Sequence, residues 1–127
     1  MTAKDIVEQL AASNDRFDWV GIYWVEGEEL VLGPYVGEHP AGHERIRIPE
    51  GVCGAVAASG ETEVVPDVRA RPGHIACDIN TRSEVVAPIR RDGRIIGVLD
   101  VDSNVLDAFS PTDVEAIEQA ALGATNA

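Results

Sequence analysis

Alternation of apolar and polar positions predicts the central strands of this chain. Residues 18–25 read Asp-Trp-Val-Gly-Ile-Tyr-Trp-Val, and a period of two puts alternate residues on opposite faces of a strand. One face then carries Trp19, Gly21 and Tyr23. The other carries Val20, Ile22 and Trp24. Gly21 leaves a gap between two aromatic side chains, which either a small apolar group or a neighbouring backbone could fill.

The same pattern predicts further strands, several of them joined by turns. These strands are expected at residues 29–33, 45–48, 61–65, 84–89 and 94–102. The Asp-Gly pair at 92–93 marks a hairpin turn, whereas Pro34–Gly42 is rich in Gly and Pro and predicts a loop. In the longest strand, alternation places four residues on one face: Ile96, Val98, Asp100 and Asp102.

Three segments have the features of helices. Thr2–Ala12 carries apolar residues at helical spacing behind a possible cap at Thr2. Residues 51–60 are rich in small side chains and end at Gly60, which places Cys53 in a first helical turn, where unpaired N–H groups favour a thiolate. The last helix begins at Ser110 with proline in its first position. Its expected apolar stripe is Val114, Ile117, Ala121 and Leu122.

Antiparallel strands with helices at both chain ends predict an α+β fold, with a central antiparallel sheet flanked by helices. A chain of 127 residues fits one domain over residues 1–127 and can bury a core without disulfides or metals. We see no internal repeat and no linker.

Charge and composition exclude several functions. The net charge of −12 would repel nucleic acids and anionic membranes, so neither is expected as a partner. We expect a cytoplasmic location, because the chain has no apolar run of membrane-spanning length and no signal-peptide core. In that compartment its two cysteines are better candidates for catalysis or redox sensing than for a structural disulfide.

Residues 66–84 form a long polar segment that contains Cys77. Segments of this length in small domains are usually functional or disordered. Apolar strands at Val65 and Val85 hold both ends, which favours order. We therefore interpret the segment as an active-site loop with the sulfur of Cys77 as its reactive atom, although a buried, unreactive thiol is the ordinary alternative.

Acidic residues extend the apolar rows of two strands. Asp100 and Asp102 continue a row of aliphatic side chains, and Glu84 begins the strand that leaves the loop. Such carboxylates are costly unless they meet a cation, a donor or a shared proton, and a close cluster would hold one proton near neutral pH. The two aspartates could instead be simple caps at a strand end.

A metal site is the weaker interpretation of the same residues. The possible ligands are His39, His43, Cys53, His74 and Cys77. None of them has the tight spacing of a zinc site, so we predict neither a metal nor another cofactor.

Seven sequence blocks, in order, resemble the GAF-domain free methionine-(R)-sulfoxide reductases. The blocks are Trp-Val-Gly-Ile-Tyr (19–23), Leu-Val-Leu-Gly-Pro (30–34), Gly-Val-Cys-Gly (51–54), Val-Val-Pro-Asp-Val (64–68), Pro-Gly-His-Ile-Ala-Cys-Asp (72–78), Ser-Glu-Val-Val (83–86) and Gly-Val-Leu-Asp-Val-Asp-Ser (97–103). They cover nearly the whole chain, and their order is more specific than any single block.

The resemblance implies a single GAF domain that reduces the free amino acid rather than sulfoxides within proteins. It places Cys77 at the nucleophile position and Cys53 at that of a second cysteine. The pocket residues that it implies are the carboxylates Glu84, Asp100 and Asp102 and the aromatic walls Trp19 and Tyr23. It also implies a thioredoxin-like or other dithiol reductant and a homodimer.

One position departs from the resemblance. Many members have a further cysteine ten residues before the second one, where this chain has His43. The sulfenic acid formed on Cys77 would then be resolved by Cys53 or by an external thiol. A non-catalytic GAF sensor that binds a small molecule is the alternative function, and a turnover assay separates the two.

Overall fold

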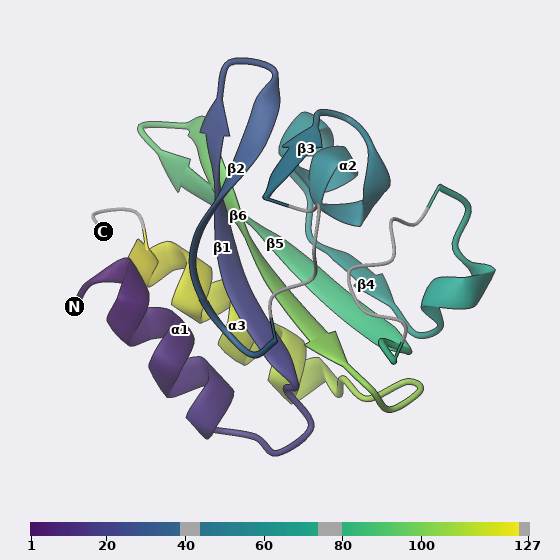
Figure 1. Cartoon of the computed structure of the whole chain (residues 1–127). Helices are drawn as coiled ribbons and strands as arrows, with labels where there is room; N and C mark the ends of the chain where they lie inside the picture. Colours follow the sequence, from purple (N-terminus) through teal and green to yellow (C-terminus); the bar gives the residue numbers. More distant parts are fainter. Residues whose placement is uncertain (39–43, 74–79, 125–127) are drawn as a thin grey trace.

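The computed structural model describes residues 1–38, 44–73 and 80–124, and its centre is a six-stranded sheet (Figure 1). The strands are β1 (Trp19–Glu26), β2 (Glu29–Val36), β3 (Arg45–Arg47), β4 (Glu63–Val65), β5 (Ser83–Arg91) and β6 (Arg94–Ser103). They lie in the order β3-β2-β1-β6-β5-β4, and every neighbouring pair is antiparallel. The predicted α+β fold is therefore confirmed.

Three helices cover the two faces of the sheet (Figure 1). They are α1 (Ala3–Ala12), α2 (Gly51–Ser59) and α3 (Pro111–Gly123), and a short 3₁₀ turn, η1, spans Val68–Ala70. Helices α1 and α3 pack on one face, with Val7 and Ile117 fully buried. Helix α2 packs on the opposite face through Val52 and Val56.

The two faces of β1 are those predicted from alternation. Val20 and Ile22 belong to the core beneath α1 and α3, whereas Trp19 and Tyr23 belong to the core beneath α2. Because the sheet is covered on both faces, residues 19–23 of β1 are buried on both sides, and Trp24 and Val25 are half-buried. The α2 face is where the polar residues of interest gather.

The helix starts also agree with the sequence. Thr2 and Asp5 form a capping box on α1, and Ser110 and Asp113 form a second one on α3. In each box the hydroxyl accepts from a backbone N–H and the carboxylate accepts from the cap's own N–H. Helix α2 ends at Gly60, as predicted.

Strand β2 is longer than the sequence indicated. We expected it to end at Gly33 and a loop to begin at Pro34, but it runs on to Val36. The register with β1 shifts between Gly21 and Tyr23, which is the signature of a bulge. A bulge accommodates proline because it leaves a residue outside the hydrogen-bonded ladder.

Two other expectations were wrong for local geometric reasons. Ile96 packs on the α1 and α3 side, not with Val98, because the β5–β6 register shifts between Ile89 and Arg90. Leu122 is 68% exposed, because it is the next residue after buried Ala121 and so lies about 100° around the helix.

None of the helices that the structure describes is long and apolar enough to cross a bilayer.

Candidate active site

Two cross-strand rows bring the acidic residues together on the face beneath α2. Asp102 pairs with Trp19 on one side and with Glu84 on the other. Asp100 likewise pairs with Gly21 and with Val86. Directly paired residues in antiparallel strands point to the same face, with Cβ atoms about 5 Å apart. The sheet register therefore places all three carboxyl groups on the side that carries the aromatic residues.

Helix α2 adds a thiol to this group. Its first turn holds Cys53, as the sequence predicted. The Sγ atom of Cys53 and carboxyl oxygens of Glu84 and Asp100 lie within 4.8 Å of one another. These residues are almost completely buried, with exposed fractions of 4% for Cys53 and Glu84, 0% for Asp100 and 2% for Asp102.

The site raises the pKa of Asp100 well above the ordinary value of an aspartate. Burial is the main cause, because desolvation disfavours the charged form, and negative charge on Asp102, Cys53 and Glu84 acts in the same direction. Neither oxygen of Asp100 meets a hydrogen-bond donor among the described residues. The nearby Glu84 carboxyl also raises this pKa, because a hydrogen bond between the two groups needs a proton on one of them.

The aspartates are not strand-end caps. Both lie within the hydrogen-bonded part of β6, with paired strands on each side. Full burial of the Asp100 carboxyl, with no hydrogen-bond donor among the described residues, is costly for the fold, which favours a chemical role for it.

Aromatic side chains form one wall of the site. The rings of Trp19 and Tyr23 lie with centroids 6.2 Å apart and planes tilted by 33°. The gap expected at Gly21 is occupied by Trp19 itself, because a Cβ atom on Gly21 would lie 2.2 Å from its ring. Neither a small apolar ligand group nor a neighbouring backbone fills that space.

Tyr35 is a member of this wall that we did not predict from the sequence. It pairs with Gly21 in the sheet, and its ring stacks on Trp19 at 5.8 Å with an interplanar angle of 14°. We missed it because Pro34 indicated a loop. Alternation would not have found it, because the bulge puts Tyr35 on the same face as Leu32, three residues earlier, whereas Gly33 faces Trp24 on the other side.

A cation lies close to the acidic cluster. The Arg71 guanidinium binds the carboxylate of Glu63 through two contacts of 2.6 and 3.0 Å. Its pKa is raised chiefly by this bond, with a further contribution from the charge of Glu84. Arg71 also lines a hollow of about 370 Å³ at the start of α2, together with Gly51 and Gly73.

Cys77, the predicted nucleophile, lies outside the described residues, as do His39, His43 and His74. The described residues on either side place the ends of its segment. Val65 pairs with Glu84, and the backbone N–H of Val68 donates to the carbonyl of Arg82. Both ends therefore lie beside the acidic cluster.

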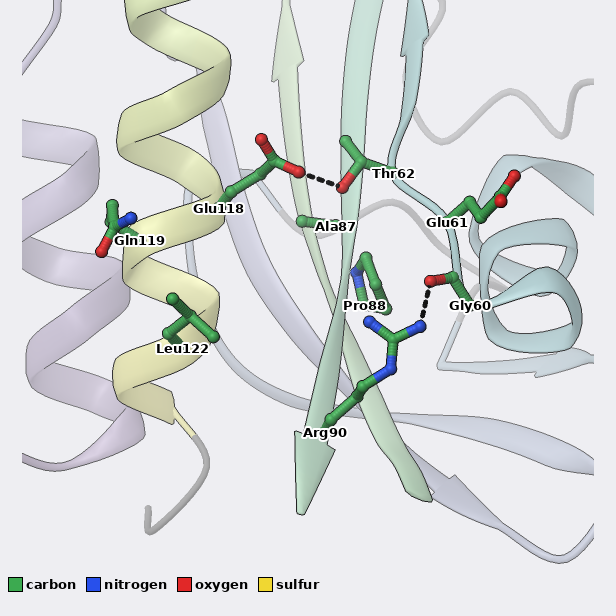
Figure 2. A pocket seen from close by; sticks show the side chains of 9 residues that line it. All are labelled: Gly60, Glu61, Thr62, Ala87, Pro88, Arg90, Glu118, Gln119 and Leu122. Atoms are coloured by element: carbon green, nitrogen blue, oxygen red, sulfur yellow. Dashed lines mark hydrogen bonds between the residues drawn. The ribbon is translucent and has the colours of Figure 1, made fainter. Parts of the chain in front are cut away.

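A larger hollow among the described residues lies elsewhere. It measures about 660 Å³ and lies between α3, β5 and the end of α2. Figure 2 shows Glu118 turned toward Thr62, whose hydroxyl donates to it at 2.8 Å, and Arg90 donating to the carbonyl of Gly60. These polar groups are already satisfied by one another, and the lining carries no thiol. The buried cluster is the stronger candidate site.

Comparisons with known proteins find similar sequences and folds over nearly the whole chain. The profile of the GAF domain matches residues 2–127. A type II free methionine-R-sulfoxide reductase from Thermoplasma acidophilum has 32% identity and a TM-score of 0.93, over 97% of this chain and 86% of that one. The free methionine-R-sulfoxide reductase from Neisseria meningitidis, solved in complex with its substrate, has 41% identity and a TM-score of 0.90, over 98% and 74%.

Among curated relatives, the free methionine-R-sulfoxide reductase of Saccharomyces cerevisiae is 42% identical over 82% of this chain and 59% of its own length. The chain spans between 59% and 70% of the length of the first curated relatives that it matches.

Proposed function

This chain belongs to the GAF-domain family of free methionine-R-sulfoxide reductases, and we propose on that basis that it reduces free L-methionine-R-sulfoxide to methionine. The observation that carries the proposal is the buried group of Cys53, Glu84 and Asp100. The sulfur of Cys53 and carboxyl oxygens of the two acids lie within 4.8 Å of one another. Sulfoxide reduction requires a thiolate and a proton at the same place. The Asp100 carboxyl, which retains its proton beside helix α2, can supply the proton.

In the first step, the thiolate of Cys77 attacks the sulfoxide sulfur. One of the two carboxyl groups, that of Asp100 or that of Glu84, gives its proton to the oxygen, the sulfur–oxygen bond breaks, and the oxygen leaves on Cys77 as a sulfenic acid. Methionine is released, and the donor becomes a carboxylate. The raised pKa of Asp100 favours this role, because a carboxyl that is still protonated near neutral pH can act as a general acid.

In the second step, a thiol condenses with the sulfenic acid to form a disulfide and water. Cys53 is the internal candidate. The carboxylate left by the first step, whose oxygen lies within 4.8 Å of the Cys53 sulfur, accepts the thiol proton, and that proton goes to the departing hydroxide, which balances the step. A thioredoxin-like or other dithiol reductant then supplies two electrons and two protons to reopen the disulfide.

The remaining parts of the site bind and orient the substrate. Trp19 and Tyr23 offer an apolar surface for the methyl group and side chain next to the sulfur. The ionised members of the acidic cluster would attract the ammonium group of the free amino acid. A residue within a protein chain lacks that ammonium group, which is a reason for the preference for free methionine sulfoxide.

The direct test is an assay of the purified protein with dithiothreitol and four substrates. These are the R and S epimers of free methionine sulfoxide and the same two epimers within a short peptide. We expect turnover of the free R epimer. Comparable rates with the peptide, or equal use of both epimers, would contradict the proposal. Binding of the free sulfoxide without methionine formation would instead favour the sensor function.

The route of resolution needs its own measurement. After one turnover without reductant, mass spectrometry should find a Cys53–Cys77 disulfide, two hydrogens lighter than the reduced protein. Cys53→Ser should stop at a sulfenic acid that dimedone can trap. Trapping of that sulfenic acid in protein with intact Cys53 would show that an external thiol, and not Cys53, resolves it.

A further inference from the structure

Packing contacts hold the Trp19 indole, and no hydrogen bond to the described residues does. Its exposed fraction is 7%, and its N–H meets no acceptor among the residues that the structure describes. A buried indole usually has such an acceptor. Without one, contacts with neighbouring atoms decide where the ring lies.

Glycines make the space in which this ring lies. A Cβ atom on Gly21 would be 2.2 Å from the outer edge of the six-membered ring, and one on Gly37 would be 2.7 Å from Cδ1. Real Cβ atoms do not approach other atoms so closely. Gly37 also has a φ of +123°, which side chains rarely tolerate. The indole therefore lies against backbone at both of its ends.

Tyr35 covers the indole from solvent. Its ring stacks nearly parallel to Trp19, with a centroid distance of 5.8 Å, while 40% of Tyr35 remains exposed. Tyr35 and Asp100 are the two sheet partners of Gly21. The stack is therefore one strand away from the buried acid, and the indole lies between the two.

From this arrangement we propose that Tyr35 is a positioning residue, which holds the Trp19 indole against Gly21 and Gly37 as a preformed wall for the substrate. The inference rests on the proposed function and goes beyond it by naming the residue that sets the position of the wall. Tyr35 need not touch the reacting atoms. Its effect is on substrate binding, because a loose indole must be ordered each time a substrate binds.

The chain's two tryptophans allow a readout that is independent of activity. In a Trp24→Phe background, the fluorescence comes from Trp19 alone. Tyr35→Ala should shift this emission to longer wavelength and increase its quenching by acrylamide, because the indole gains solvent. Tyr35→Phe retains the ring and should leave both signals unchanged.

Steady-state kinetics supply the second readout. Tyr35→Ala should raise KM for free methionine-R-sulfoxide about three- to tenfold, the range for loss of one aromatic pair, and change kcat less than about twofold. Tyr35→Phe should restore the wild-type KM. Leu122→Ala removes another exposed apolar side chain, on α3, and serves as the matched control that changes neither readout.

The possible results separate this inference from the proposed function. An unchanged KM, or an unchanged Trp19 emission, in Tyr35→Ala would overturn the positioning role, as would a Tyr35→Phe variant that behaves like alanine. If the wild-type protein does not reduce free methionine sulfoxide, the proposed function fails, while the emission of the same variants still decides whether Tyr35 holds the indole.

Discussion

The buried acid Asp100 is costly for the stability of the fold, and its proposed role as a proton donor accounts for that cost. It is fully buried in the middle of β6, and its carboxyl has no hydrogen-bond donor among the described residues. An asparagine there would fill the same volume without a charge to desolvate. Retaining an acid makes sense if its proton is used.

The pKa of Asp100 gives a stability prediction with a definite sign. The pKa of Asp100 is raised in the folded state. At pH values between the ordinary aspartate pKa and this higher pKa, Asp100 is therefore protonated in the folded protein and ionised in the unfolded chain. Stability relative to Asp100→Asn is therefore lost as pH rises through that window and is not regained above it. Thermal melts from acid to pH 9 should show the Tm of Asp100→Asn increasingly above that of the wild type.

Asp15→Asn removes the same charge from an exposed position and is the control for net charge. A difference between Asp100→Asn and the wild type that is constant across the pH range would contradict this account of burial.

Glu84 is expected to matter for turnover more than for folding. Glu84→Gln removes the carboxyl group next to Asp100, while it keeps the shape of the side chain. We expect kcat/KM to fall about a hundredfold, at the low end for loss of general acid catalysis. Kinetics on a variant whose melting curve is like that of the wild type would show this. Unchanged kinetics would leave Glu84 with a structural role.

At the scale of elements, sequence patterns predicted which residues share a face of one strand, but not which strands and helices come together. Period two separated Trp19 and Tyr23 from the opposite core, and it placed Asp100 beside Asp102. The approach of Glu84 and Cys53 to Asp100 depends on strand register and on how α2 packs, which are long-range contacts that local periodicity does not contain. The family resemblance, and not the pattern, grouped these residues in advance.

Two of the errors came from single departures from regular strand geometry. A bulge let β2 continue through Pro34, which hid Tyr35, and a register shift turned Ile96 to the other face. Neither shift has a clear signal in one sequence, because a bulge adds a residue without changing the composition of the strand.

The capping box of α3 makes a prediction at this scale. Ser110 accepts from the N–H of Asp113 at 3.1 Å, and Asp113 also binds Arg16 at 3.3 Å, so the cap joins α3 to the segment after α1. Ser110→Ala should cost about 1 kcal/mol of unfolding free energy and lower Tm by about 4 °C. Calorimetry should find no such loss in Thr112→Ala, an exposed neighbour in the same turn.

For the whole molecule, the net charge of −12 sets the response to salt. Self-repulsion of an acidic surface opposes the compact state. Raising NaCl from about 0.01 M to about 1 M shortens the screening length from about 30 Å to about 3 Å, so Tm should rise. KCl at the same ionic strength should give the same increase. A Tm that falls with salt would mean that attractive ion pairs outweigh repulsion.

Association of the chain stays a prediction. The family resemblance implies a homodimer, which light scattering on the protein in solution would measure directly. The same acidic surface makes high ionic strength the favourable condition for observing it.

The contact between Trp19 and Gly21 also limits the order in which these positions can change during evolution. The two residues share one volume, so an alanine at position 21 is accepted only after the indole has been replaced by a smaller side chain. A lineage that changes position 21 first passes through a poorly folded intermediate, whereas one that changes position 19 first does not. Ancestors with glycine at 21 and no tryptophan at 19 are the expected connecting forms.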